Sequence, residues 1–300
     1  MKLKSVGKYL RYRSEIIRER RNARNHLIIV EPFGGLANRM RVIASGIWLK
    51  NKIEGDLVVI WSPDQSLNCP YELIFENNEN FKIIRMNDYI KNVRATNQAD
   101  WIETTKSGIV NKFMGIDYCI KECDFPNLIK FGKIDILEVA RKNKVIYFQT
   151  CQEFGDGQFA YKSYKPISQI QEQIGLASKL FTASTIGIHI RRTDHDRSIK
   201  NSPIALFIEK MQGEISVNAN TNFFLATDDS EVEKTMFDLF GPKIMTHGKK
   251  RSRNTVKGIQ DAVVDLYCLS KTSKIMGSYW SSFSTAASRI SQIELEIIQK

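Results

Sequence analysis

The second half of the sequence alternates short apolar runs with helical stretches of about ten residues. Two parallel strands need a long crossover between them, usually a helix, so this alternation predicts a parallel sheet with helices on both faces. Ligands bind such sheets at the carboxyl ends of the strands. The expected strands are residues 185–190, 222–226, 243–245 and 274–277, and the expected helices are residues 203–212, 230–240, 258–270 and 282–297.

The first half begins in the same way and then becomes irregular. Its expected elements are strands at residues 27–30, 57–61 and 144–148 and a helix at residues 36–49. A helix expected at residues 167–183 follows the domain boundary and begins the second half. Residues 63–135 show no regular pattern, so we expect them to shape an individual binding site rather than the scaffold. The predicted organisation is a basic helical segment at residues 1–25 and two α/β domains at residues 26–165 and 166–300.

Positive charge is concentrated at the N-terminus. The chain has 300 residues, a net charge of +11 and a pI near 9.3, a balance that suits an anionic partner such as a nucleotide, a nucleic acid or an anionic lipid surface. Much of the excess precedes residue 25, where the pattern predicts an amphipathic helix. This helix packs on the body of the protein, makes a weak peripheral contact with an anionic membrane face, or is simply a solvated surface helix.

Several partners and compartments are disfavoured. We expect no nucleic-acid partner, because the sequence shows no nucleic-acid-binding motif and the charge is confined mainly to the first segment. The chain lacks the apolar core of a signal peptide and any long apolar stretch, which predicts a cytoplasmic protein, with attachment to the inner face of the membrane as an open alternative. The five cysteines are odd in number and are expected to be reduced. Cys119 and Cys123 have the spacing of a zinc half-site, but the other half is missing, so no metal site is predicted.

An apolar strand ending at Ile190 runs directly into a cluster of polar side chains. The cluster consists of His189, Arg191, Arg192 and Asp194. Arginine forks hold phosphate bidentately and stay charged at any physiological pH. A surface ion pair would explain one of these arginines with one acid, but not the whole cluster, which therefore predicts a phosphorylated ligand.

A glycine turn stands where the first strand meets the first helix. Gly34 and Gly35 would let backbone amides approach a ligand closely, and Asn38 and Arg39 would project near the start of the helix. The turn matches neither the dinucleotide fingerprint nor a phosphate-binding P-loop. Tight packing of the helix on the strand would explain the same glycines equally well.

Hydroxyl groups gather after the strand at residues 274–277. Ser281, Ser282 and Ser284 are placed to cap a helix and to bind an oxyanion such as a diphosphate at its positive end. Helix capping alone would also account for them. Asp265 lies on the preceding helix, where a surface acid is the common case. A bound guanine would donate two hydrogen bonds to the carboxylate of Asp265.

These motifs together resemble the fucosyltransferase superfamily, which includes the α-1,6-fucosyltransferases, the bacterial nodulation-factor fucosyltransferase and the protein O-fucosyltransferases. The match rests on GGLANR at 34–39, HIRRTD at 189–194, ATDD at 226–229 and the run from Asp265 to Ser284. It covers most of residues 175–295 but only the glycine turn in the first half. The resemblance implies a GT-B fold of two Rossmann-like domains with a nucleotide-sugar cleft between them. The first would be the acceptor-side domain and the second would bind GDP-fucose.

The resemblance also implies roles for individual residues. Fucose would be transferred with inversion and without a metal, and Arg191 would hold the β-phosphate and support its departure. His189 and Asp265 would recognise the guanosine, and Ser281 and Ser282 would contact the diphosphate. The Asp228-Asp229 pair would order the pocket rather than bind a metal. The full expected set of nucleotide-sugar-binding residues is Gly34, Gly35, Asn38, Arg39, His189, Arg192, Asp194, Asp228, Asp229, Asp265, Ser281, Ser282, Phe283 and Ser284.

The expected catalytic base is the point at which this chain departs from the family pattern. The α-1,6-fucosyltransferases follow the arginine motif with a lysine and then a glutamate, whereas Ile199 stands in the place of that glutamate here. Either His195 or Asp196 could take the proton of the acceptor hydroxyl, and we favour Asp196.

Three readings stay open besides transfer of fucose to a glycan or lipid-linked saccharide. The same fold could use another GDP-sugar donor, such as GDP-mannose, because Asp265 says nothing about the sugar. Catalysis could have been lost while the nucleotide pocket was kept, as the missing glutamate allows. The basic segment, finally, could add contact with a membrane.

Overall fold

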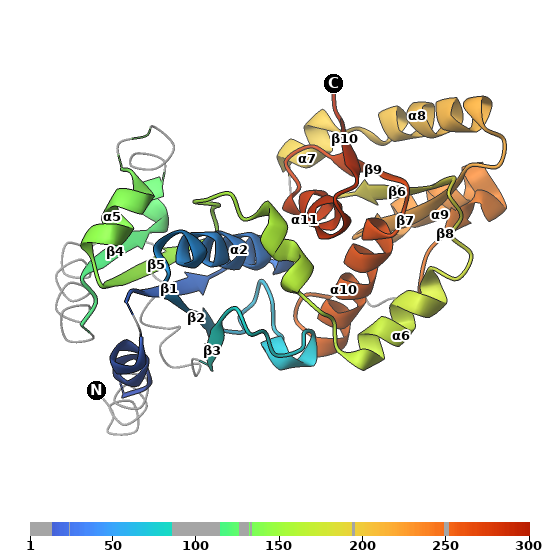
Figure 1. Cartoon of the computed structure of the whole chain (residues 1–300). Coiled ribbons are helices and arrows are strands. Elements are labelled where there is room, and N and C mark those ends of the chain that lie inside the picture. Colours follow the sequence, from blue (N-terminus) through green and yellow to red (C-terminus); the bar gives the residue numbers. More distant parts are fainter. Residues whose placement is uncertain are drawn as a thin grey trace. The chain divides into compact units, whose positions relative to one another are not determined.

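A computed structural model describes residues 14–23, 25–85, 115–125, 132, 134–193, 196–248 and 252–300 of the chain (Figure 1). It divides into two compact units. Unit 1 comprises residues up to Ser66 together with Asn77–Ser163, and unit 2 comprises Leu67–Glu76 together with Tyr164–Lys300. The short segment Leu67–Glu76 joins unit 2 because Phe75 forms a β-bridge with Pro166 and the Ile167 amide donates to the Ile74 carbonyl. The sequence did not predict that a segment of the first half belongs to the second unit.

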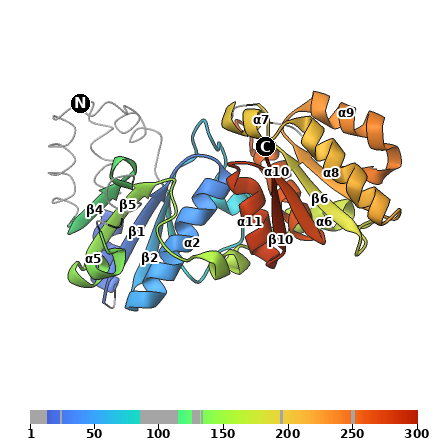
Figure 2. The ribbon, with the colours of Figure 1, turned by 90° about the horizontal axis from the view of Figure 1, so that it is seen from above.

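Unit 1 is built on a five-stranded parallel sheet with the order β3-β2-β1-β5-β4, seen with its strands side by side in Figure 2. Its strands are β1 (Leu27–Pro32), β2 (Asp56–Trp61), β3 (Lys82–Arg85), β4 (Tyr118–Lys121) and β5 (Val145–Thr150). Its helices are α2 (Leu36–Ile53), α5 (Ile136–Lys142) and the 3₁₀ turns η2 (Glu122–Asp124) and η4 (Gln158–Ser163), besides a helical stretch at residues 14–22.

Two helices cover opposite faces of this sheet. Gly46 of α2 packs so closely that a Cβ there would lie 3.0 Å from the Leu57 side chain. On the other face, Ile16 is buried in one cluster with Leu27 and Ile29. The described part of the basic N-terminal segment therefore packs on unit 1, which is one of its three predicted roles. The predicted membrane contact of residues 1–25 remains a prediction.

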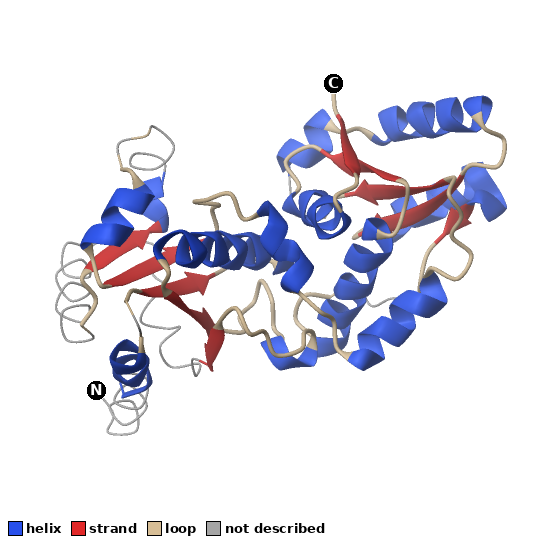
Figure 3. Cartoon of the chain, viewed as in Figure 1, coloured by secondary structure: helices blue, strands red, loops and turns tan. Residues whose placement is uncertain are grey.

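Unit 2 repeats the design with the sheet order β10-β9-β6-β7-β8, again with every neighbouring pair parallel. Figure 3 shows the strands of the chain in red and its helices in blue. Its strands are β6 (Thr185–Ile190), β7 (Asn222–Thr227), β8 (Ile244–Met245), β9 (Lys274–Ser278) and β10 (Glu294–Ile298). Its helices are η1 (Tyr71–Leu73), α6 (Ser168–Ala177), α7 (Asp196–Asn201), α8 (Ile204–Val217), α9 (Ser230–Phe240), η5 (Gly241–Lys243), α10 (Val256–Ser270) and α11 (Ser282–Ser291).

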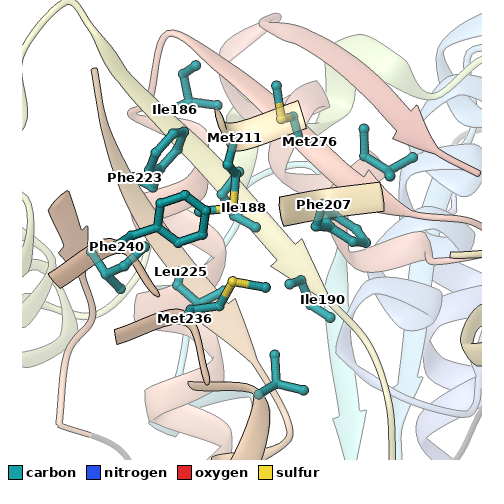
Figure 4. Close-up of a cluster of buried hydrophobic side chains, with 13 residues drawn as sticks. Ile186, Ile188, Ile190, Phe207, Met211, Phe223, Leu225, Met236, Phe240 and Met276 are labelled. Carbon is teal, nitrogen blue, oxygen red and sulfur yellow. The ribbon is translucent and has the colours of Figure 1, made fainter. Parts of the chain in front are cut away.

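The alternation of side chains along β6 separates the two faces of the unit 2 sheet. Ile186, Ile188 and Ile190 point into a cluster with Phe207 and Met211 of α8 and with side chains of α9 (Figure 4). Gly187 and His189 face the other way. A Cβ on Gly187 would lie 2.7 Å from the Thr272 hydroxyl beyond the end of α10, and the His189 ring lies against Phe283 of α11.

The structure confirms the strands and most of the helices expected in both halves, and it corrects three expectations. The helix expected at 167–183 ends at Ala177, where the Ser178 amide makes the last helical hydrogen bond to the Ile174 carbonyl. The helix expected at 282–297 stops at Ser291, because Gln292 adopts a left-handed conformation with φ of 56° and turns the chain into β10. The region 63–135, expected to be irregular, contributes β3 and β4 to the unit 1 sheet. Residues 86–114 of that region lie outside the described part of the chain.

The cysteines behave as structural thiols. None of the five, all of which are described, forms a disulfide. Burial raises the pKa of Cys69 to about 12, and burial together with neighbouring Glu122 raises that of Cys151 to about 11, so both stay protonated at neutral pH. No described helix is both long and apolar enough to cross a membrane.

Candidate functional site

The loops that leave β6 and β9 are bound to each other at the carboxyl edge of the unit 2 sheet. The Arg191 amide donates to the Ser278 hydroxyl over 3.1 Å, and that hydroxyl lies 3.3 Å from the His189 carbonyl oxygen to which it donates. The Tyr279 amide donates to the Ser202 hydroxyl over 2.8 Å. Ser202, which stands just before α8, donates in turn to the Ile298 carbonyl of β10. One hydroxyl network therefore fastens three strand ends at the place where parallel sheets bind ligands.

The two adjacent arginines have different surroundings. Arg192 is buried, and its Nη1 and Nη2 atoms donate to the Arg191 and Ser202 carbonyls over 3.0 Å and 2.7 Å. Burial lowers the pKa of Arg192, and the charges of Asp228 and Asp229 oppose this. Arg191 keeps part of its surface exposed. The sequence grouped both guanidiniums around a phosphate, but the structure commits the Arg192 fork to the strand-end loop. The phosphate contact of Arg191 remains a prediction.

Asp228 and Asp229 each organise backbone at the end of β7. Asp228 accepts from the Arg192 amide over 2.8 Å and from the Thr193 hydroxyl over 2.8 Å, so it ties the β7 exit to the β6 exit. Asp229 caps α9, accepting from the Glu231 amide over 2.8 Å. Both carboxylates therefore order backbone, while the predicted ordering of a nucleotide pocket remains a prediction. Among the residues that the structure describes, no three His, Cys, Asp or Glu side chains form a group that could hold a metal ion.

The start of α11 brings the predicted hydroxyls and His189 together. Ser281 is the N-cap, and its hydroxyl accepts from the Phe283 amide over 3.4 Å. Ser284 is fully buried and donates to the Ser281 carbonyl, so it supports the turn and has no surface to offer a ligand. Phe283 packs on His189 with ring centroids 5.0 Å apart. A Cβ on Gly277 would lie 2.6 Å from the Ser284 hydroxyl, which explains why glycine is needed for this close packing.

Asp265 of α10 faces a histidine that the sequence did not predict. The carboxylate is nearly buried, and its Oδ1 lies 3.0 Å from Nδ1 of His247, close enough for an ion pair although the angle is outside hydrogen-bond geometry. Nε2 of His247 lies 3.9 Å from Asp261 Oδ1, and Asp261 also pairs with Lys257 over 2.8 Å. The Asp265 carboxylate can therefore bind a guanine only if His247 interacts with it at the same time or moves away from it. His247 follows β8, so its position after a strand is the sequence feature that could have identified it.

The glycine turn of unit 1 is held by Arg39. Arg39 is fully buried, and its Nε, Nη1 and Nη2 atoms donate to the Gly34 carbonyl, the Ser62 carbonyl and the Asp64 carboxylate over 2.9, 2.7 and 2.7 Å. The guanidinium also lies 4.9 Å above the Trp61 ring. The sequence placed Arg39 among the ligand-binding groups; this burial instead makes it a scaffold residue of the turn. Its pKa is lowered by burial, which the Asp64 charge and hydrogen bond oppose.

Gly34, Gly35 and Asn38 are the other residues of the turn that the sequence predicted as ligand-binding groups. Gly34 has φ of +79°, which favours glycine, and Gly35 is the N-cap of α2, which no side chain caps. A Cβ on Gly34 would lie 3.0 Å from the Asn38 side-chain nitrogen, so Asn38 sits against the turn.

The two candidate bases differ in what the structure shows. Asp196 is exposed and is the first residue of α7. His195 and Asp194 lie outside the described residues. The choice of Asp196 over His195 therefore remains a prediction.

Two parallel-sheet halves of Rossmann type define the GT-B class of fold, as the sequence predicted. No protein-family model matches the sequence, and no curated protein matches it significantly. Solved structures do match over nearly the whole chain. A crystal structure of NodZ α-1,6-fucosyltransferase soaked with GDP-fucose superposes with a TM-score of 0.61 and 17% identity, covering 89% of this chain and 93% of that one.

Two further neighbours agree with this fold. The apo form of POFUT1 gives a TM-score of 0.55 at 11% identity, covering 91% of this chain and 98% of that one. A point mutant of Arabidopsis thaliana FUT1 in complex with GDP gives 0.57 at 12% identity, covering 99% and 79%. The fold of this chain is thus the fold of GDP-fucose fucosyltransferases, which confirms the predicted resemblance at the level of structure.

Proposed function

We propose that this chain is an inverting, metal-independent glycosyltransferase that transfers fucose from GDP-fucose to a glycan or lipid-linked saccharide. The observation that carries the proposal is the placement of Arg191. It is partly exposed at the carboxyl edge of the unit 2 sheet, and its backbone is fixed by the Ser278 hydroxyl. The similarity to fucosyltransferase structures crystallised with GDP-fucose or GDP supports the choice of donor.

The proposed chemistry follows from where charge develops. Breaking the bond between the sugar and the diphosphate places negative charge on the leaving oxygen, and a fixed cation stabilises that charge best when it needs no reorganisation. Arg191 supplies the cation, while Ser281, Ser282 and the amides at the start of α11 receive the diphosphate. Arg192 and Asp228 act as positioning residues, because they hold the loop that carries Arg191.

Guanosine recognition is assigned to His189 and Asp265. Guanine presents two neighbouring N–H donors to a carboxylate, and Asp265 is nearly buried, so a guanine that reached it would form hydrogen bonds shielded from water. His247 would orient the carboxylate from behind. Asp196 is the proposed base for the acceptor hydroxyl, because it is exposed on the element that directly follows the arginine motif.

The donor is tested by thermal shift with GDP, UDP, ADP and CDP, followed by GDP-fucose and GDP-mannose. A nucleotide at a hundred times its dissociation constant stabilises the folded protein by about 2.7 kcal/mol. We expect a response to GDP and GDP-fucose that exceeds the response to the other ligands. An equal response to GDP-mannose would point to the alternative donor, and no response to any guanine nucleotide would contradict the proposal.

Catalysis is tested by Arg191→Ala. Removal of a charge-stabilising donor of this kind slows turnover on the order of 100- to 1,000-fold. We expect that loss in the hydrolysis of GDP-fucose to GDP and fucose, measured by GDP release, with an unchanged unfolding temperature. Arg141→Ala, which removes the same charge from an exposed position on α5, is the matched control. Equal turnover in both variants would remove Arg191 from the mechanism, and binding of GDP-fucose without any turnover by the wild type would favour an inactive binding protein.

A further inference from the structure

An exposed indole stands at the same sheet edge as Arg191. Trp280 follows β9 in the loop that leads to α11, and it is 58% exposed. Single exposed apolar side chains are common on protein surfaces, so exposure alone says little. Two features of its backbone and its neighbours distinguish this one.

The first feature is the backbone of Trp280, which has φ of 58°. Left-handed backbone is uncommon for residues with a Cβ and exceptional for bulky ones. Among the described residues, the other non-glycine cases are Glu54 and Gln292, which end α2 and α11, where this conformation is a normal helix ending. Trp280 ends no helix and precedes the Ser281 N-cap. Backbone strain of this kind gathers at ligand-binding sites, where the surroundings hold it in place.

The second feature is the way in which the ring is held. The Arg197 guanidinium of α7 lies 5.1 Å from the centre of the Trp280 ring, a cation–π arrangement that fixes one face of the indole. The Tyr279 ring lies 5.8 Å away at a tilt of 49°, and its backbone amide is bound by Ser202. We call Trp280, Arg197 and Tyr279 the indole platform. Its backbone is strained, its ring is braced and its surface is open to solvent.

The platform is connected to both ends of the proposed reaction. Arg197 directly follows Asp196, the proposed base, at the start of α7. Trp280 directly precedes Ser281 and Ser282, the proposed diphosphate ligands. Through Arg197 and through its own place in the chain, the indole is therefore adjacent to the element that carries the proposed base and to the residues proposed to hold the leaving group.

We propose that Trp280, braced by Arg197, is the stacking platform for a sugar ring of the acceptor. The inference rests on the proposed function and adds a residue of unit 2 to acceptor recognition, which the sequence assigned to the first domain alone. A sugar ring offers a flat C–H face to an aromatic ring and hydroxyls to polar groups around it, and tryptophan supplies a flat apolar body with one N–H donor. The nucleotide base has partners elsewhere, at His189 and Asp265. One indole is also far too small for a stable protein interface, which buries many more residues on each side.

The experiment measures saccharide binding and nucleotide binding in parallel. An array of oligosaccharides built from glucose, N-acetylglucosamine, galactose and mannose is probed with the full-length protein saturated with GDP. We expect the wild type to bind at least one saccharide class and Trp280→Ala to bind it about tenfold more weakly. Trp280→Phe keeps a flat ring and should retain most of the affinity. GDP affinity should stay within about twofold in both variants, because the platform is assigned to the acceptor.

Controls separate this proposal from its alternatives. Phe159→Ala removes an aromatic side chain that is 66% exposed on η4 of unit 1 and should leave saccharide binding unchanged. If Trp280→Ala fails to fold, Trp280→Gly replaces it, since glycine accepts positive φ without strain.

The outcomes are distinguishable. Equal saccharide binding by the wild type and Trp280→Ala, or no saccharide binding by the wild type, would overturn the platform while GDP binding upholds the proposed donor. Loss of GDP binding in Trp280→Ala would move the indole to the donor and overturn the proposal. No GDP binding by the wild type would overturn the proposed function and the platform together.

Discussion

The two units carry the same kind of sheet but fasten its carboxyl edge with different chemistry. In unit 1 the fastening groups are charged: Arg39 joins the glycine turn to the end of β2, and Glu122 joins the end of β4 to the end of β5. In unit 2 the neutral hydroxyls of Ser202 and Ser278 fasten the ends of β6, β9 and β10, beside the charged Arg192 and Asp228 at the exits of β6 and β7. The comparison teaches that a charged residue at a strand end is part of the scaffold when it is buried with its partners. The ligand role proposed for Arg191 therefore depends on the part of its side chain that reaches solvent.

Arg39→Met should give the largest loss of stability. The substitution keeps most of the side-chain volume but leaves the Gly34 and Ser62 carbonyls and the Asp64 carboxylate without their buried donor. Breaking a buried pair in this way costs about 3–5 kcal/mol. Urea unfolding followed by circular dichroism measures the loss. The exposed Arg141→Met on α5 should change the free energy of unfolding by less than about 0.5 kcal/mol. Similar unfolding curves for the two variants would show that Arg39 does not hold the turn.

This contrast also marks how far the sequence could go. The strand, glycine turn and helix at residues 27–49 could be predicted, because apolar periodicity and glycine act locally. The role of Arg39 could not, since Ser62 and Asp64 are brought to it only by the pairing of β1 with β2. Sequence alone therefore identified an arginine beside a glycine turn but assigned it to the ligand.

The same limit applies in unit 2. The alternation of side chains along β6 could be predicted from the sequence, because Ile186, Ile188 and Ile190 share one face of the strand. The same alternation, continued past the strand, predicts that Arg191 and Arg192 point toward opposite faces of the sheet. Which of the two arginines is buried could not be predicted. It depends on Ser202, ten residues further along the chain, because the Ser202 carbonyl accepts a hydrogen bond from Nη2 of Arg192. The strand β10 was hidden for a different reason, because five residues are too few to distinguish a strand from a helix continuation until Gln292 turns the chain.

Ser202→Ala should give a smaller loss, in unit 2. Its hydroxyl is fully buried, accepts from the Tyr279 amide and donates to the Ile298 carbonyl, and alanine leaves both backbone groups unsatisfied. Such a loss costs about 1–3 kcal/mol. Urea unfolding of Ser202→Ala is compared with Ser216→Ala, which removes an exposed hydroxyl from α8. If the two variants were equally stable, the hydroxyl network would not hold the strand ends together.

Glu122→Gln should give the smallest loss, and the loss should depend on pH. Burial raises the pKa of Glu122, but hydrogen bonds from Thr150, Gln152 and Cys151 outweigh it, so the pKa is lower in the folded protein than its usual value. A carboxyl with a depressed pKa stabilises the fold above its unfolded pKa of about 4.3, and this stabilisation disappears as the pH falls through the folded pKa. Because the group is partly exposed, we expect Glu122→Gln to cost about 1 kcal/mol at pH 7 and almost nothing at the acid end.

The pH dependence turns the difference between the units into a measurement. Urea unfolding of the wild type, Glu122→Gln and Ser202→Ala is followed from pH 7 down to the lowest pH at which the fold persists. The curves of the wild type and Glu122→Gln should converge as the pH falls, because protonation removes the same charge from the wild type. The curve of Ser202→Ala should run parallel to the wild type, since a serine hydroxyl does not titrate in this range. Parallel curves for both variants would mean that the charge of Glu122 contributes nothing to the free energy of unfolding. The Glu122 contacts in unit 1 and the Ser202 hydroxyl in unit 2 would then act alike, as uncharged hydrogen-bonding groups.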